Sequence, residues 1–423
     1  MTPSKQLVGS PQIGEQIAIE SHATDATAKR PDLPALTSIR FIFSLMVVIG
    51  HFQGHYAAEL PTPPTWIYGF ATYAVSFFFV LSGFILTYNY PDLQTAGKIA
   101  KFLVFRIARI YPVHVITILA TILLFVDSWA RTVYLLPLTY WQNVSLTQTW
   151  GMIPFTATSF NGPSWSISNE WFFYLMFPLV ISRNKIVCSA AVILPIAASL
   201  LIKLHYGCLM GPVLNKPFDP QEISGTTVYS LFPPSRFIEF LAGVLLCKLM
   251  RPTRKLPIAM LQIGALAIAV VSMDGNASSP TIIHGLIQTI WTPAIGCLII
   301  GSLSVQNNLV DLILVNRPLI FLGEISFSVY MTHLIVFQWF WLHADLLKGI
   351  TVYLKFVILF GITIAASSLL FLCVESPMRL GTRALFKRCS TPAAVAVACL
   401  FWATTALVVW AIGYAWFVST LKR

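Results

Sequence analysis

Charged residues are scarce in this sequence. Only 10% of its 423 residues are Asp, Glu, Lys or Arg, 57% are hydrophobic, and the mean hydropathy is +0.75. A soluble domain carries about 25% charged residues, so this composition excludes an ordinary soluble protein and indicates one that lies in lipid. Segments that alternate polar and apolar residues are also missing, which argues against a membrane β-barrel.

The short motifs of several common chemistries are missing too. The seven cysteines form no CxxC pair, and only Cys208 falls in a predicted outside loop, so no disulfide framework follows. His51 and His55 have the spacing of a metal-binding pair, but no third ligand stands at a useful spacing, and we expect no metal site. The sequence also contains no P-loop, no GxSxG and no GxGxxG motif.

The Lys and Arg residues are distributed as in a membrane protein of fixed orientation. The formal net charge is +11, which could suggest a nucleic-acid partner. With the amino terminus placed inside, however, most of the 27 Lys and Arg residues fall in inside segments, as the positive-inside rule requires. We therefore expect a cytoplasmic amino terminus and no binding of nucleic acid.

Eleven apolar segments are long enough for transmembrane helices, which need about 20 residues. They are 36–56, 66–88, 110–127, 165–182, 186–204, 230–250, 256–273, 282–304, 318–342, 350–374 and 394–419. The predicted fold class is all-α, a polytopic transmembrane helical bundle. Residues 1–35 are predicted to be a disordered cytoplasmic tail, 36–380 the main transmembrane domain, and 381–423 a basic linker with an extra C-terminal transmembrane helix, the eleventh span.

Two regions between the spans are long enough to have structure of their own. Residues 88–109 place four basic residues among Ile, Phe and Val, which predicts an amphipathic interfacial helix that enters the third span. Residues 128–164 are rich in aromatic and amide side chains, and we expect them to pack on or dip into the outer face as a re-entrant lid.

Arg40 and His51 are the most informative residues of the chain, because both lie in the first span. Eleven residues at about 100° each return almost to the same helix face, and the two side chains stand roughly 16 Å apart along the axis. Ionisable groups inside a membrane are by default functional candidates, and imidazole suits general-base work near neutral pH. Arg40 could instead extend to the inner interface, with His51 bonded to a neighbouring helix.

Arg106 and Arg109 are spaced i, i+3 and therefore share a helix face at the cytoplasmic rim. Guanidinium groups match phosphate geometry better than ammonium groups do. Plain positive-inside anchoring would explain either arginine alone, but together with Arg40 at the same depth they favour an anion site.

Glu170 is expected near the outer end of the fourth span, one turn beyond Ser166 and close to Trp165 and Trp171. A carboxylate framed by tryptophans suits a sugar, because indole faces stack on sugar rings and carboxylates accept hydrogen bonds from hydroxyl groups. An interfacial aromatic belt with a solvated Glu170 is the alternative.

Three further patterns lie on the sixth, ninth and second spans. Arg236 and Glu239 are spaced i, i+3, which favours a structural ion pair. Tyr330 and His333 continue a polar stripe that starts at Ser326, and it could line a site or hold helices together. Gly83 is interpreted as a close-packing position only.

The order and spacing of these motifs resemble the acyltransferase-3 family of integral-membrane O-acyltransferases, over about residues 33–380. The matching motifs are Arg-x10-His of Arg40 and His51, FFFVLSGF of 77–84, Arg-x-x-Arg of Arg106 and Arg109, WSIxxE ending at Glu170, RFIEFLAG of 236–243, GxxS…YxxH of 323–333, and ExP of Glu375 to Pro377. Phe327 and Met331 depart from the family's usual Tyr and Leu. Many members carry a hydrolase-like periplasmic domain after an eleventh span, and we expect the span but not the domain here.

The resemblance implies a ten-helix family core plus the eleventh span, in a bacterial inner (plasma) membrane. It implies acyl-CoA, with acetyl-CoA the expected form, as co-substrate, its phosphates held by Arg40, Arg106 and Arg109. His51 would activate the acceptor hydroxyl or carry the acyl group briefly, and Glu170 would act with it. The acceptor would be a glycan or oligosaccharide, bound by Trp165, Ser166, Tyr330 and His333.

A secondary transporter of a small anionic or sugar-like solute is the alternative from another class, because midplane ionisable residues among eleven spans also suit one. The sequence shows no inverted repeat and no paired spans broken by Gly or Pro, which favours the enzyme. A receptor or scaffold is a third alternative.

Overall fold

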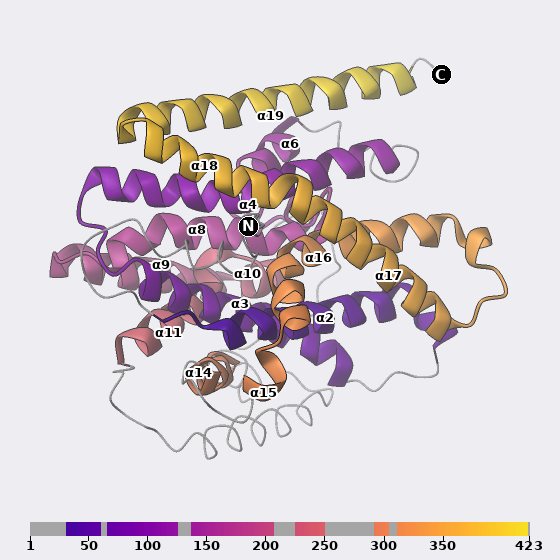
Figure 1. Cartoon of the computed structure of the whole chain (residues 1–423), viewed down its shortest axis with the longest axis horizontal. Coiled ribbons are helices and arrows are strands. Elements are labelled where there is room, and N and C mark those ends of the chain that lie inside the picture. Colours follow the sequence, from indigo (N-terminus) through magenta and orange to yellow (C-terminus); the bar gives the residue numbers. More distant parts are fainter. Residues whose placement is uncertain are drawn as a thin grey trace, which may run out of the picture.

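Every regular element in the described part of the chain is a helix (Figure 1). The computed structural model describes residues 31–60, 66–125, 137–206, 225–249, 292–303 and 311–421. Its long helices are α2 (Pro34–His55), α3 (Trp66–Asn89), α4 (Ala96–Leu124), α8 (Trp165–Val180), α9 (Lys185–His205), α11 (Pro233–Leu249), α14 (Thr292–Leu303), α16 (Arg317–Leu342), α17 (Val352–Leu370), α18 (Ser376–Arg388) and α19 (Thr391–Leu421). Within these ranges seven helical stretches are long and apolar enough to cross a membrane, which confirms the polytopic all-α fold class.

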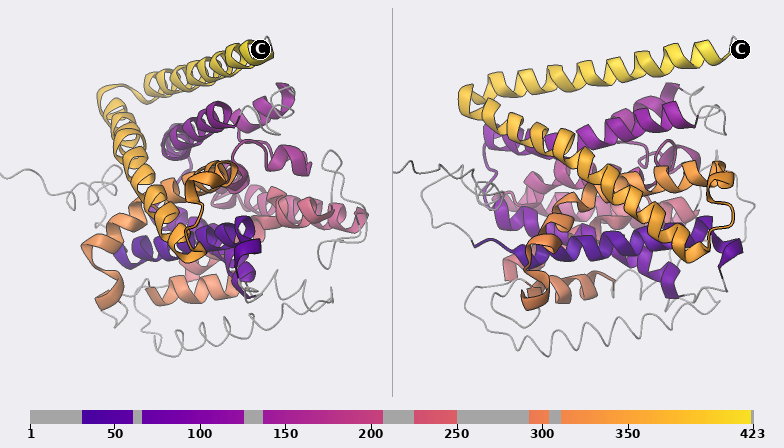
Figure 2. Two further views of the ribbon diagram at one scale, coloured as in Figure 1. Left: turned by 90° about the vertical axis from the view of Figure 1, so that its right-hand side faces the viewer. Right: turned by 45° about the vertical axis from the view of Figure 1, so that its right-hand side comes forward.

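Most of the predicted spans coincide with these helices. The span predicted at 256–273 lies outside the described residues, and of that at 282–304 only α14 is described. The eleventh apolar segment forms α19, which lies along one side of the bundle against α4, while α14 lies on the opposite side (Figures 1 and 2).

The helix predicted within residues 88–109 enters the third span without a break, as residues 96–124 show. They form one continuous helix, α4, which Thr95 caps by accepting a hydrogen bond from the backbone N–H of Lys98 at 3.3 Å. The helix passes through Pro112 without a break. The two arginines of the Arg-x-x-Arg motif therefore belong to the amino-terminal half of a long helix.

The region predicted as a re-entrant lid is described from residue 137 onward. It contains only short helices, namely α6 (Pro137–Val144), α7 (Pro154–Ala157) and the 3-10 turn Gly162–Ser164. Most of its polar side chains are buried: Thr139, Asn143, Gln148, Thr149, Thr156, Ser159, Asn161 and Ser164. Their hydrogen bonds satisfy a backbone that runs inside the bundle without forming a span.

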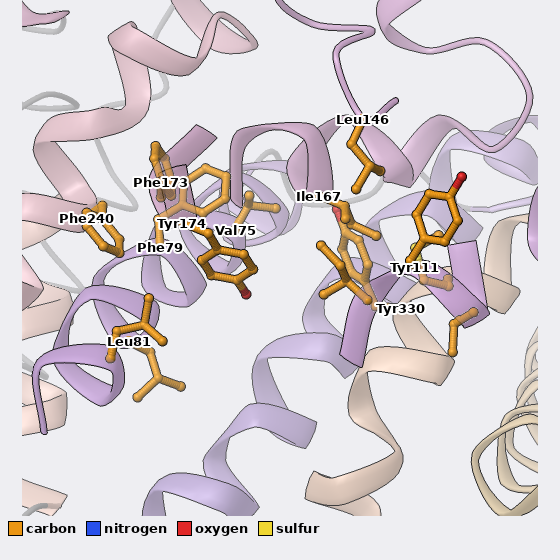
Figure 3. Packing of buried hydrophobic residues seen from close by; sticks show 14 of the residues in the cluster. Val75, Phe79, Leu81, Tyr111, Leu146, Ile167, Phe173, Tyr174, Phe240 and Tyr330 are labelled. Atoms are coloured by element: carbon orange, nitrogen blue, oxygen red, sulfur yellow. The ribbon is translucent and has the colours of Figure 1, made fainter. Parts of the chain in front are cut away.

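An aromatic cluster joins α3, α8 and α11 (Figure 3). The ring of Phe173 lies edge-on to Phe79 at 5.1 Å between centroids and stacks on Phe240 at 5.0 Å. These three side chains are at most 1% exposed. Ser166, two turns before Phe173 on α8, contacts Tyr330 of α16, so α8 joins the aromatic cluster to α16.

Glycines let two pairs of helices approach closely. A Cβ at Gly83 of α3 would overlap the backbone carbonyl of Phe240, and a Cβ at Gly243 of α11 would overlap that of Val80. A Cβ at Gly323 of α16 would overlap the carbonyl of Thr37 on α2. The expectation that Gly83 is a close-packing position is confirmed.

Gly83→Ala should therefore lower the stability of the folded protein by about 1–3 kcal/mol, because the added methyl forces α3 and α11 apart. Gly361→Ala on α17 is the matched control: its Cβ would have no neighbour within 4 Å, and alanine favours the helix. Thermal unfolding of the two variants in the same detergent measures the difference. Equal midpoints for both would contradict the close-packing role.

Candidate active site

Two imidazoles meet in the interior of the bundle. The Nε2 atom of His333 on α16 lies 2.9 Å from the Nδ1 atom of His51 on α2, and the ring centroids are 5.0 Å apart. His333 is fully buried. Two residues that the sequence marked separately therefore form one pair.

The parallel packing of α2 and α16 brings the two rings to the same depth. Gly323 lies against Thr37, the Ser44 hydroxyl donates to the carbonyl of Ser326 at 3.2 Å, and His51 meets His333. The partners rise together along both helices, so the helices run in the same direction. The two helices correspond to the first and ninth predicted spans, and odd-numbered spans cross a membrane in the same direction. The sequence therefore predicts their parallel direction, but no sequence pattern predicts which spans are neighbours.

The turn before α8 packs against the same stretch of α16. The Ser166 hydroxyl donates to the Tyr330 hydroxyl at 2.9 Å, and that hydroxyl donates to the carbonyl of Pro163 at 3.0 Å. The Asn161 amide donates to the carbonyl of Met331 at 2.8 Å. Ser166, Tyr330 and His333 are thus brought together as neighbours, as the sequence prediction required of one site.

Trp165 has a different environment from the one expected. Its ring lies edge-on to Phe79 at 6.1 Å between centroids, within the aromatic cluster of α3 and α8. The half-buried indole thus contacts apolar rings rather than the histidine pair. An edge contact of this kind leaves less of the ring face for stacking on a sugar than the sequence alone suggested.

Arg40 belongs to a cluster of arginines. It lies on the same face of α2 as His51, nearer the amino-terminal end of the helix. Arg40 interacts electrostatically with Arg109 of α4 and Arg379 of α18. Its Nε atom is buried and makes no hydrogen bond among the described residues. A buried guanidinium nitrogen without an acceptor fits an anionic group of a substrate.

Arg106, the third arginine of the predicted anion site, is held at the edge of this cluster. Its Nη2 donates to the Tyr90 hydroxyl at 3.0 Å, and its guanidinium lies over the Tyr90 ring at 5.3 Å from the centroid. Lys98 and Arg183 near this end instead pair with Asp92, at 2.7 Å and 3.5 Å. The hydrogen bond from Lys98 keeps the pKa of Asp92 below its usual range.

Two carboxylates face the arginines. Glu375 is 1% exposed, accepts a hydrogen bond from Ser328 at 2.9 Å, and pairs with Arg379 at 3.5 Å. It lies in a π-helical turn, Phe371–Glu375, between α17 and α18, and such turns are frequent at functional sites. Arg379 and the placement of Glu375 were missed by the sequence analysis, although the ExP motif marked that segment.

Glu170 lies deeper than its expected place at the outer end of the fourth span. It accepts a 2.6 Å hydrogen bond from the Tyr174 hydroxyl and interacts electrostatically with Arg40. Ser166, one turn earlier on α8, contacts Tyr330 close to the histidine pair. Glu170 therefore lies between the histidine pair and the arginine cluster, because α8 runs in the opposite direction to α2.

A third histidine was not singled out from the sequence. His114 of α4 is fully buried, and its Nε2 lies 2.9 Å from the carbonyl of Asn143. Asn143 in turn donates to the hydroxyl of Ser159 at 2.7 Å. His114 thus ties α6, which carries Asn143, to α4. Within the described ranges, no group of three or more His, Cys, Asp or Glu side chains could hold a metal ion.

Arg236 and Glu239 form an ion pair of 3.2 Å away from the histidines. Ser76 of α3 donates to Glu239 at 3.1 Å and accepts from Arg236 at 2.8 Å, and the Arg236 guanidinium lies over the Phe79 ring. The pair therefore joins α11 to α3 beside the Gly83 contact.

Glu239→Gln should lower the stability by about 3–5 kcal/mol, because it leaves the buried Arg236 charge without its partner. Asp92→Asn is the control, since Asp92 pairs with Lys98 at 2.7 Å with side chains 36% and 34% exposed, and losing a surface pair costs at most about 1 kcal/mol. Unfolding midpoints measure both. A Glu239→Gln protein as stable as Asp92→Asn would show that the buried pair is not structural.

Comparison with known proteins identifies the family of the chain. A family model described as an acyltransferase domain, Acyl_transf_3, matches residues 33–372. Acyltransferase MdmB of Streptomyces mycarofaciens is 30% identical over 243 residues, which are 52% of this chain and 58% of that protein. No solved structure matches. The family match covers α2 to α17 and includes both histidines of the pair, so the chain belongs to the acyltransferase-3 family of membrane proteins.

Proposed function

We propose that this protein is a membrane O-acyltransferase that moves an acyl group from cytoplasmic acyl-CoA to a hydroxyl group of an extracytoplasmic or membrane-proximal glycan. One observation carries the proposal: α2 presents Arg40 to a buried arginine cluster and His51 to a buried histidine partner, on one helix face. An anion site and a reactive imidazole are thus joined by a single rigid element.

The donor would enter from the arginine end. Arg40, Arg106 and Arg109 would hold the phosphates of acyl-CoA, because guanidinium groups bind phosphate oxygens through paired, charge-assisted hydrogen bonds. The pantetheine arm would follow α2 toward His51, which lies roughly 16 Å further along the axis. In this way the thioester crosses part of the membrane while the charged nucleotide stays at the rim, with the amino terminus cytoplasmic and the chain in the inner (plasma) membrane.

At the histidine pair the acceptor hydroxyl would attack the thioester carbonyl. His51 takes the hydroxyl proton while the new C–O bond forms, and returns it to sulfur as the C–S bond breaks. The products are an ester and CoA with a free thiol. In the other route, His51 itself accepts the acyl group and passes it to the hydroxyl in a second step. Both routes use the same imidazole.

The acceptor would approach from the other end of the bundle, past the turn before α8. Ser166 and Tyr330 border the histidine pair there, and with Trp165 and His333 they are our candidates for acceptor contacts. Glu170 remains our second catalytic candidate. Its carboxylate would accept hydrogen bonds from hydroxyl groups that reach past Ser166 toward His51.

His51→Ala should abolish ester formation, a loss of at least 100-fold, because general acid–base groups contribute about 10²–10⁴-fold. The assay supplies purified protein with radiolabelled acetyl-CoA and with the surface glycan of a strain that lacks the gene, and detects acylated glycan by mass spectrometry. His343→Ala is the control, since that histidine is exposed at the far end of α16. Unchanged activity in His51→Ala would refute the enzyme proposal.

Arg40→Gln should raise the KM for acetyl-CoA about 10- to 100-fold, because each hydrogen bond between charged groups is worth about 1.5–3 kcal/mol. Arg183→Gln is the matched control, since Arg183 is exposed and pairs with Asp92 outside the cluster. Initial rates at varied acetyl-CoA measure both. Equal KM values for the two variants would remove the arginine cluster from donor binding.

A secondary transporter predicts another outcome of the same experiment. Reconstituted protein would then drive uptake of a small anionic or sugar-like solute along a gradient, with no ester formed and no requirement for acetyl-CoA. The direct contact of His51 with His333 is the feature that favours acyl transfer.

A further inference from the structure

The His51–His333 contact determines which nitrogen of His51 is able to react. We infer that His333 is a positioning residue: it holds His51 in the Nδ1–H tautomer, so that the bare Nε2 atom of His51 faces the reaction. This inference rests on the proposed acyl transfer and specifies the atom that performs it.

The argument starts at His333. Its Nδ1 atom lies 3.2 Å from the backbone carbonyl oxygen of Val329, one turn earlier on α16. A carbonyl oxygen only accepts, so Nδ1 of His333 must carry the proton. A neutral imidazole has one N–H. The Nε2 atom of His333 is then a lone-pair acceptor.

The consequence passes to His51 through the 2.9 Å contact. Because the Nε2 atom of His333 has no proton to give, the Nδ1 atom of His51 must be the donor of that hydrogen bond. The second nitrogen of a neutral His51, Nε2, is left with a lone pair. Free histidine favours the opposite tautomer in water. His333, together with the backbone of Val47 one turn earlier on α2, therefore selects the form that suits a base or a nucleophile.

The packing around His333 keeps its ring in this orientation. The ring lies edge-on to Phe337 at 5.9 Å between centroids. The two residues before His333 are also held in place. The Asn161 amide donates to the carbonyl of Met331, and the Thr332 hydroxyl contacts the hydroxyl of Ser367 at 2.7 Å. A flip of the His333 ring would break the hydrogen bonds to both Val329 and His51 at once.

The pair also has a role during the reaction. When Nε2 of His51 takes the proton of the acceptor hydroxyl, the ring becomes an imidazolium whose Nδ1–H already donates to His333. The neutral lone pair of His333 stabilises that charge, as a hydrogen bond from a charged donor is about twice as strong as one from a neutral donor. The proton then leaves from Nε2 to the sulfur, so His333 ends unchanged.

The tautomer can be measured without any substrate. Solid-state nitrogen NMR on the full chain, labelled at its histidine rings and assigned with a His51→Asn variant, should show His51 with a protonated Nδ1 and a bare Nε2. In His333→Leu, the Nε2–H form of His51 should become measurably populated, because only the backbone of Val47 still holds its ring. A His51 that carries its proton on Nε2 in the unsubstituted protein would overturn the inference.

Kinetics with the acetyl-CoA assay provide the second measurement. His333→Leu should lower kcat by about 100-fold, within the range known for acid–base groups, with the KM for acetyl-CoA changed less than threefold. His333→Gln should recover at least tenfold of that loss, because its amide oxygen accepts from Nδ1 of His51. His343→Leu is the matched control: its Nδ1 makes the same contact to a carbonyl one turn earlier, Trp339, at 2.8 Å, but on an exposed ring, and its kcat should be unchanged.

The outcomes separate this inference from the proposed function. If the unsubstituted chain forms no ester, the proposed function fails, while the NMR result still decides the tautomer. If ester forms but His333→Leu is fully active, or His333→Gln is no better than His333→Leu, the positioning role is refuted. Thermal unfolding of each variant distinguishes a lost fold, which would lower the unfolding midpoint, from a lost hydrogen bond.

Discussion

The close parallel packing of α2 on α16 is the contact on which the rest of the site depends. Gly323 permits it, because any larger residue would meet the backbone of Thr37. The register set at this contact places Ser44 on Ser326 and His51 on His333 further along. In a membrane, small residues are what allow such an approach. A shift of one residue would rotate one histidine away from the other.

Two carboxylates offset part of the charge of the arginine cluster inside the membrane protein. Arg40 has carboxylates within electrostatic range, Glu170 and Glu375, and like charges in Arg109 and Arg379. The carboxylates lower the cost of burying the arginines, while the buried Nε of Arg40 keeps one donor without an acceptor among the described residues. The cluster is thus partly neutralised without using every donor of Arg40.

Composition and periodicity were sufficient to predict the helical fold and most individual helices, because spans follow from local apolar length. They also marked Arg40, His51 and His333 as polar positions that a membrane does not tolerate without cause. Neighbour relations were not predictable: nothing in a single sequence places His333 against His51. The predicted position of Glu170 along its span was wrong for the same reason. That position depends on the residue at which α8 begins, and only the folded chain shows that this residue is Trp165.

The boundary of the site extends past the region that the acyltransferase family model matches. That match ends at residue 372, yet Glu375 joins the cluster and hydrogen-bonds Ser328 of α16, and Arg379 of α18 pairs with it. The π-helical turn at Phe371–Glu375 is what turns Glu375 inward to 1% exposure. In a regular α-helix the extra residue of that turn would be absent, and Glu375, together with Arg379, would rotate by about 100° away from Arg40 and Arg109. The backbone irregularity and the charge cluster are therefore one feature, and α18 belongs to the arginine cluster as much as α2 does.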